Sequence, residues 1–147
     1  EDPCFVLKKE LMAMPFLGWF AWKTKMIPVD REAHAKALKD MVRNTRARLA
    51  EGRQIMIFPE GTRTQPGVPG EYKPGVAAIY RDVEVPCYLI ATNSGAHWPA
   101  KGMTGFKPGT AVFEFLPPID ASLKRAEFMK QMETRIEAAS SALLLPR

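Results

Sequence analysis

The residues best suited to do chemistry lie in one short run in the middle of the chain. The run supplies, in order, a carboxylate, a glycine, a hydroxyl, a guanidinium and a second hydroxyl: Glu60, Gly61, Thr62, Arg63 and Thr64. The glycine allows a sharp turn and a close backbone approach to a ligand, and the arginine offers a planar fork that suits phosphate. Because the run follows a predicted strand, Gln54–Phe58, it indicates a substrate-binding site. The alternative is a structural turn in which Glu60 and Arg63 pair with each other.

A second candidate anion contact is Lys73, which is followed by Pro74 and Gly75. Proline is favoured at the first position of a helix, so these residues predict a helix that continues to about Asp82. A lysine beside the free N–H groups of a helix N-terminus can hold an anion. The alternative is a solvated lysine that merely precedes a helix.

Apolar segments alternate with segments of helical periodicity along the chain. Strands are expected at 4–7, 26–29, 54–58, 86–92 and 110–115, with helices at 31–51, 73–82 and from 120 onwards. Asp30 and Asp120 are the expected N-caps of the first and last helix, and Gly52 is the expected stop of the first. Apolar residues at three- and four-residue steps give the first helix a core-facing stripe. This alternation predicts an α/β fold with a mixed sheet flanked by helices.

Length and charge limit the possible partners. At 147 residues the chain is expected to be a single domain, 1–147, with a net charge of +5. A moderate basic excess suits anionic lipid headgroups, acidic carrier proteins or phosphorylated substrates, and it also fits a solvated surface. Nucleic acid is not an expected partner, because the sequence has no long basic run and no nucleic-acid-binding signature.

The cysteines and histidines predict neither disulfides nor metal. Cys4 and Cys87 lie in apolar segments and are expected to be free thiols in the core, which favours a reducing compartment. His34 and His97 are too few and too far apart for a metal cluster.

An aromatic segment near the start of the chain suits a membrane surface. Leu11–Trp22 is rich in methionine and aromatic residues and has lysines on both sides. It has about 12 residues, fewer than the roughly 20 that a membrane-spanning helix needs. The alternative is an irregular helix packed on the core.

Three segments together resemble the glycerolipid acyltransferases, the group that contains the 1-acylglycerol-3-phosphate acyltransferases. Phe58–Arg63 is similar to the third sequence block of that family, Ile27–Arg31 to the second and Val85–Ile90 to the fourth. Lys73 stands where family members often carry a lysine ahead of a glycine. The order and spacing match over nearly the whole chain. The resemblance implies the αβ sandwich of this family.

Two departures from the family pattern are visible. The fourth block has Leu89 where a second proline is usual. The first block, a histidine and an aspartate separated by four residues, is missing: His34 has Asp40 six positions on, and His97 has no aspartate nearby. No catalytic pair is therefore expected in these residues, and the domain is expected to be truncated at its N-terminus.

The resemblance implies a mechanism with no cofactor. An upstream histidine would be the general base on a glycerol hydroxyl, which would attack the thioester of acyl-CoA or acyl-carrier protein. Arg31 and Arg63 would hold the phosphate of lysophosphatidic acid, with Lys73 adding charge. Glu60 would support catalysis by orienting Arg63 or a substrate hydroxyl. Gly61 would permit close approach, and Thr62 would donate a hydrogen bond or cap the turn.

The implied setting is phospholipid biosynthesis, with phosphatidic acid as product. We expect the cytoplasmic face of a membrane, with the protein peripheral or anchored through a missing N-terminal segment. Three alternatives stay open: an acyltransferase for another lyso-lipid, a non-catalytic module that binds anionic lipid, and a domain whose basic face binds an acidic carrier protein.

Overall fold

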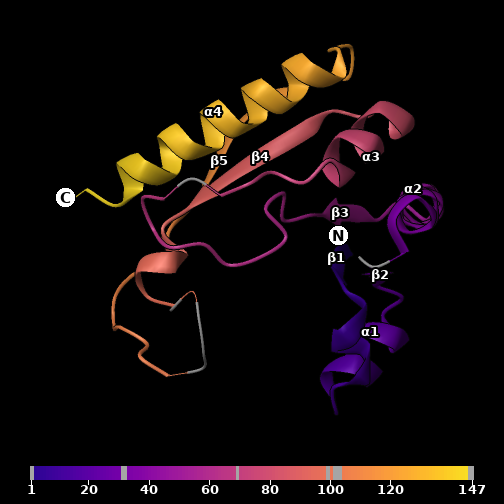
Figure 1. Ribbon diagram of the computed structural model, residues 1–147, viewed down its shortest axis with the longest axis horizontal. Coiled ribbons are helices and arrows are strands. Elements are labelled where there is room, and N and C mark those ends of the chain that lie inside the picture. Colours follow the sequence, from indigo (N-terminus) through magenta and orange to yellow (C-terminus); the bar gives the residue numbers. More distant parts are fainter. Residues whose placement is uncertain (1, 31–32, 69, 99, 101–103, 146–147) are drawn as a thin grey trace. The chain divides into compact units, whose positions relative to one another are not determined.

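The computed structural model describes residues 2–30, 33–68, 70–98, 100 and 104–145 (Figure 1). The chain divides into two compact units, each built from two stretches of sequence. Unit 1 comprises Glu1–Pro59 and Pro74–Val83, and unit 2 comprises Glu60–Lys73 and Glu84–Arg147. That residues 1–147 form one domain stays a prediction.

Unit 1 is a parallel sheet with helices. Strand β1 (Pro3–Lys8) lies between β2 (Ile27–Val29) and β3 (Gln54–Met56). The first half of β1 pairs with β3 and the second half with β2. A short 3-10 helix η1 (Lys9–Ala13), α1 (Leu17–Lys23), α2 (His34–Ala50) and α3 (Gly75–Val83) complete the unit. Its buried core is formed by Cys4, Ile27, Met41 and Ile79.

The strands of unit 1 follow the sequence patterns with one difference. Strand β2 contains Pro28 and lies at the edge of the three-stranded sheet, as its proline predicts. Strand β3 ends at Met56, whereas the prediction extended it to Phe58. The ladder stops ahead of Pro59, which has no N–H to donate, and the Phe58 ring instead stacks on Phe5 with centroids 6.5 Å apart.

The start of α2 differs from the prediction, and its end agrees with it. The helix begins at His34, and Asp30 is not its N-cap. The Asp30 carboxylate instead accepts a hydrogen bond from Lys9 Nζ at 2.9 Å. At the other end, Gly52 has φ +77° and donates its N–H to the carbonyl of Leu49 at 2.9 Å, which confirms the predicted stop.

Unit 2 is an antiparallel strand pair covered by one long helix. Strands β4 (Cys87–Thr92) and β5 (Phe113–Ile119) pair antiparallel, and α4 (Arg125–Leu143) lies along both (Figure 1). Leu89 of β4 is buried, as are Phe128 and Met132 of α4. A 3-10 helix, η3 (Ser94–Ala96), interrupts the loop between the two strands. The predicted α/β class is confirmed, although the described residues form two sheets, one parallel and one antiparallel, rather than a single mixed sheet.

Two predictions for unit 2 were wrong in detail. Strand β5 begins at Phe113 rather than at 110 and runs through Pro117 and Pro118. Its pairing in the described residues is with β4 alone, so the prolines need not donate to a second neighbour. Asp120 is not the N-cap of α4, because its Oδ1 accepts the N–H of Ser122 at 2.9 Å in a local turn. Hydrogen bonds from the Ser122 side chain and, to a smaller extent, from its N–H lower the pKa of Asp120.

Both predicted thiols are free. Cys4 is fully buried and Cys87 is half-buried. Burial raises the pKa of each, so both are protonated, unreactive side chains in the described fold.

Candidate functional site

The predicted site run opens a loop in unit 2. Glu60 to Lys73 contains neither helix nor strand among its described residues, so its own turns and side-chain contacts must fix its shape. Gly61 has φ +64°, a left-handed conformation that glycine adopts without a steric penalty. The sharp turn expected at this glycine is confirmed.

The carboxylate of Glu60 is held against the backbone of the same loop. A Cβ added to Gly70 would lie 2.2 Å from Oε2 of Glu60 and 2.7 Å from Cγ2 of Thr64. Oε2 is fully buried and has no hydrogen-bond partner among the described residues. A buried acceptor without a partner lowers the stability of the fold by about 1–3 kcal/mol, so a hydrogen bond from a ligand to this oxygen would be favourable.

Tyr72 fixes the far end of the loop. It is buried, and its hydroxyl donates a hydrogen bond to Oε1 of Glu137 in α4 at 3.0 Å. Burial raises the pKa of Tyr72, and the hydrogen bond and the negative charges of Glu137, Glu60 and Glu133 raise it further. The phenol therefore stays protonated and serves as a fixed donor.

The remaining predicted site residues differ in their surroundings. The Thr62 and Arg63 side chains are exposed, at the surface of the loop. Lys73 Nζ lies 2.6 Å from Oε2 of Glu71, so its charge is paired within the loop. The predicted lysine site at the start of α3 is thus occupied by a local ion pair. Arg31 lies outside the described residues.

The surroundings of Glu60 were not predicted from the sequence. Gly70, Tyr72 and Glu137 carry no periodic signal, and Glu137 is 65 positions from its partner. Gly70 and Tyr72 do not stand out in a loop that also contains Gly61, Gly67 and two prolines.

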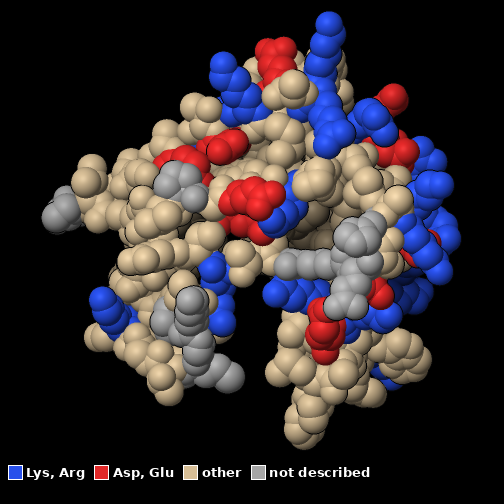
Figure 2. Space-filling view, in the orientation of Figure 1, with Lys and Arg blue, Asp and Glu red and all other residues tan. Residues whose placement is uncertain are grey.

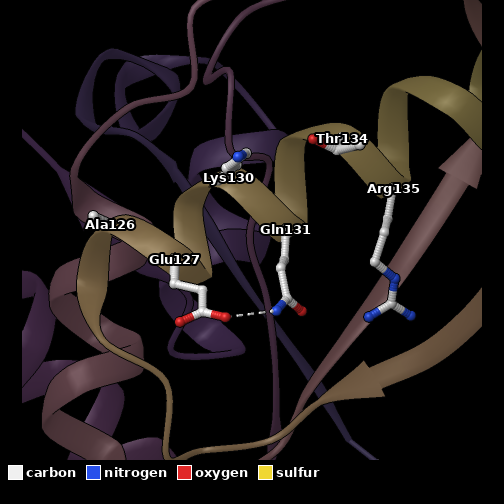
Figure 3. A pocket seen from close by; sticks show the side chains of 6 residues that line it. All are labelled: Ala126, Glu127, Lys130, Gln131, Thr134 and Arg135. Atoms are coloured by element: carbon white, nitrogen blue, oxygen red, sulfur yellow. Dashed lines mark hydrogen bonds between the residues drawn. The ribbon is translucent and has the colours of Figure 1, made fainter.

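Two other observations bear on where a ligand could bind. In the described residues, no three His, Cys, Asp or Glu side chains gather as a metal site would require. A hollow along α4 is lined by residues of that helix alone, among them Glu127, whose Oε1 accepts a hydrogen bond from Nε2 of Gln131 at 3.3 Å (Figure 3). It contains none of the predicted site residues, so the Glu60–Lys73 loop stays the candidate site.

With this geometry in place, comparison with known proteins gives the family. The family model described as Acyltransferase matches residues 1–93. The chain belongs to the acyltransferase family. The matched residues include every predicted site residue, and their individual roles stay predictions.

Relatives at the level of sequence carry a more specific name. The chain is 34% identical over 133 residues to a 1-acyl-sn-glycerol-3-phosphate acyltransferase of Pseudomonas aeruginosa, covering 90% of this chain and 51% of the relative. It is 39% identical over 112 residues to a protein of the same name from Helicobacter pylori, covering 73% and 46%. The chain therefore spans about half the length of these curated relatives.

A solved structure shows the same fold. The chain matches the 1-acyl-sn-glycerophosphate acyltransferase PlsC of Thermotoga maritima with a TM-score of 0.74, over 99% of this chain and 58% of that one. The sequence identity is 20%, so this likeness concerns the fold alone. The predicted family and the predicted αβ fold are both confirmed.

Proposed function

We propose that the protein transfers a fatty acyl group to the free hydroxyl of 1-acylglycerol-3-phosphate and forms phosphatidic acid, a step of phospholipid biosynthesis. The acyl donor would be acyl-CoA or acyl-carrier protein. The names of the relatives in Pseudomonas aeruginosa and Helicobacter pylori support this acceptor. The run from Phe58 to Arg63 supports it from the chemistry of the chain itself.

One observation carries the proposal: Oε2 of Glu60 is buried with no hydrogen-bond partner among the described residues, and the exposed Arg63 follows three residues later. A glycerol phosphate with one free hydroxyl offers both a donor and an anion. The hydroxyl can satisfy the carboxylate oxygen, and the phosphate can bind the guanidinium through two parallel hydrogen bonds. Gly61, whose φ is +64°, has no side chain that would keep a substrate away from the backbone.

The reaction is an exchange of a thioester for an ester. The acceptor oxygen bonds to the acyl carbonyl carbon, the carbon–sulfur bond breaks, and the thiol leaves with the proton of the hydroxyl. A base must take that proton first. Since the 147 residues contain no histidine and aspartate separated by four residues, the proposal requires a base from outside them. Phosphate binding is also the proposed role of Arg31, and Lys73 could add its charge only by leaving Glu71.

The proposed place of reaction is the cytoplasmic face of a membrane, where a lysophospholipid acceptor is available. No helix in the described part of the chain has the length and apolar character needed to cross a bilayer. Exposed side chains of α1 are the proposed means of attachment.

An acceptor panel tests the proposal. The complete protein would be assayed with labelled acyl-CoA and acyl-carrier protein against 1-acylglycerol-3-phosphate, glycerol-3-phosphate and 1-acylglycerol-3-phosphocholine. We expect transfer to the first acceptor, and a large loss in Glu60→Gln, which keeps the size of the side chain and removes its charge. Transfer to the choline lipid alone would overturn the assigned acceptor. Lipid binding without any transfer would replace the enzyme with the non-catalytic module.

A further inference from the structure

Helix α1 packs through its small residues. Gly18 and Ala21 are its buried residues. A Cβ added to Gly18 would lie 2.0 Å from the backbone oxygen of Met12, so the glycine is required for the contact between α1 and the residues of η1. At Gly18 the backbone of α1 therefore packs directly against the backbone of Met12, with no space for a side chain.

The large apolar side chains of α1, and that of Phe16 just before it, are exposed. Phe16 is 88% exposed, Trp19 62%, Phe20 56% and Trp22 69%. These four residues form what we call the α1 aromatic surface. A helix that packs only on a core buries its large side chains and exposes its small or polar ones. Since α1 does the reverse, its exposed side is built to contact something else.

A strained turn holds the most exposed ring outward. The N–H of Leu17 donates to the carbonyl of Pro15 at 2.7 Å, and Phe16 between them has φ 60° and ψ −55°. This is a classic γ-turn, which is rare because a side chain at its centre is crowded. Strain of this kind is kept where it serves a function, and here it directs Phe16 away from the core.

Lysines lie at the C-terminal end of α1, next to the aromatic surface. Lys23 Nζ lies 5.7 Å from the centroid of the Trp19 ring, and Lys25 Nζ forms a long ion pair, 4.0 Å, with Oε1 of Glu51. Lys8 is exposed at the end of β1. Figure 2 shows that the surface over α1 is mainly uncharged, with both basic and acidic side chains at its edge. Aromatic rings bordered by lysines match an interface where acyl chains meet anionic headgroups.

We propose that the α1 aromatic surface is the membrane-docking surface of this chain and that it binds bilayers containing anionic lipid. The four rings enter the boundary between headgroups and acyl chains, while Lys8, Lys23 and Lys25 contact lipid phosphates. Seven residues of helix are far too short to span the bilayer, so α1 lies at its surface. This inference rests on the membrane location in the proposed function, but it does not depend on acyl transfer.

The three tryptophans of the chain allow a direct test. Trp19 and Trp22 lie on α1, and Trp98 is comparably exposed, at 55%, in unit 2. One variant, Trp98→Phe, leaves the α1 pair as fluorescent reporters, and the double variant Trp19→Phe/Trp22→Phe leaves Trp98. Each is titrated with phosphatidylglycerol–phosphatidylcholine vesicles whose acyl chains carry bromine, which quenches tryptophan at short range.

We expect strong quenching and a blue shift for the α1 pair and little change for Trp98. Equal quenching of both reporters, or quenching of Trp98 alone, would overturn the assigned surface. Co-sedimentation with the same vesicles separates the two proposals. Sedimentation without quenching of the α1 pair would sink this inference and leave the membrane location standing, whereas no sedimentation would remove both.

Vesicle binding by variants of the rings and of Lys23 is an independent test. Phe16→Ser/Trp19→Ser is expected to weaken vesicle binding by at least roughly tenfold, which is about 1.4 kcal/mol. Phe113→Ser is the matched control, because Phe113 is 62% exposed and lies in unit 2. Binding should also weaken with added salt and in Lys23→Glu. Equal losses in the α1 variant and the Phe113 control, with circular dichroism unchanged, would refute the proposal.

Discussion

The Tyr72 hydroxyl donates a 3.0 Å hydrogen bond to Oε1 of Glu137 and thereby ties the loop that carries Glu60 to helix α4. The loop from Glu60 to Lys73 has no ladder or helix of its own among the described residues, so its position depends on contacts of this kind. Glu60 contributes to the negative charge around the phenol, which places the candidate carboxylate in the same electrostatic environment as the Tyr72 anchor.

Removing the Tyr72 hydroxyl should loosen this loop. In Tyr72→Phe the free energy of unfolding is expected to fall by about 1.5–3 kcal/mol, because a buried hydrogen bond to a charged acceptor is lost. Urea denaturation would measure the change. Tyr88→Phe is the control, since Tyr88 is 68% exposed and should give no difference. Equal stability of Tyr72→Phe and the parent protein would show that the hydrogen bond does not hold the loop.

The Tyr72 phenol also predicts that the free energy of unfolding depends on pH in the alkaline range. Its pKa is raised above the ordinary value of 10.0, chiefly by burial, so the folded state keeps a proton that the unfolded state loses above that value. The stabilisation is present below about pH 10 and declines as pH rises further, with a limiting slope of about 1.4 kcal/mol per pH unit. Tyr72→Phe should lack this component. Parallel stability curves for parent and variant above pH 10 would contradict the assignment.

For Gly18, the sign of the stability change on substitution by alanine tests the packing of α1. On an exposed helical face, glycine to alanine stabilises by about 1 kcal/mol. Because a Cβ at Gly18 would meet a backbone oxygen at 2.0 Å, Gly18→Ala should instead destabilise by about 3 kcal/mol. Gly52→Ala serves for comparison: nothing lies within 4 Å of its Cβ position, and its positive φ alone should cost about 1 kcal/mol. A stabilised Gly18→Ala would mean that α1 does not pack as described.

Arg53 holds the start of β1 through several acceptors. It is 6% exposed; its Nε lies 2.8 Å from Oδ2 of Asp2, and its Nη2 donates to the carbonyl of Pro3 at 3.2 Å. Lysine cannot reproduce this fork, so Arg53→Lys is expected to cost about 2 kcal/mol by chemical denaturation.

Arg43→Lys is the matched control for Arg53. Arg43 pairs with Asp40 at 2.9 Å on α2, but its side chain is 73% exposed, so the change should lie within about 0.5 kcal/mol of zero. Similar effects of the two substitutions would show that the buried fork contributes nothing beyond a surface ion pair.

The sequence predicted elements well where one local rule acted alone. Gly52 ends α2 because its positive φ and the helix-stop rule agree, and Pro28 marks an edge strand for the same kind of reason. Asp30 and Asp120 were predicted as caps and are not. Each carboxylate found a competing partner, Lys9 for the first and the N–H of Ser122 for the second. Lys9 is 21 positions from Asp30, so local sequence does not reveal that pair, whereas Ser122 lies two residues from Asp120 and forms a local turn that competes with the cap.

The candidate site likewise has features that the sequence predicted and features that it did not. The need for glycine at position 61 could be argued from residue type, and the structure confirms it. The packing of Glu60 against Gly70 and the contact from Tyr72 to Glu137 join residues 10 to 65 positions apart. Lys73 was predicted to bind an anion, and in the structure its ammonium group pairs with the carboxylate of Glu71, two residues away.

Arg63 carries the prediction that bears most directly on function. In the complete protein, Arg63→Ala should raise KM for 1-acylglycerol-3-phosphate far more than KM for the acyl donor, because the guanidinium is proposed to hold the acceptor phosphate. Losing one charged contact costs about 1.5–3 kcal/mol, which corresponds to roughly 10- to 150-fold in kcat/KM. Steady-state kinetics with each substrate varied in turn would measure both effects.

Two further variants separate phosphate binding from general charge. Arg63→Lys keeps the charge and loses the planar fork, so it should recover only part of the activity if the phosphate is held by two parallel hydrogen bonds. Arg81→Ala removes an exposed arginine outside the run and should leave both KM values unchanged. If Arg63→Ala raised KM for donor and acceptor equally, Arg63 would be acting on the shape of the loop. The phosphate contact would then have to come from another cation of the chain.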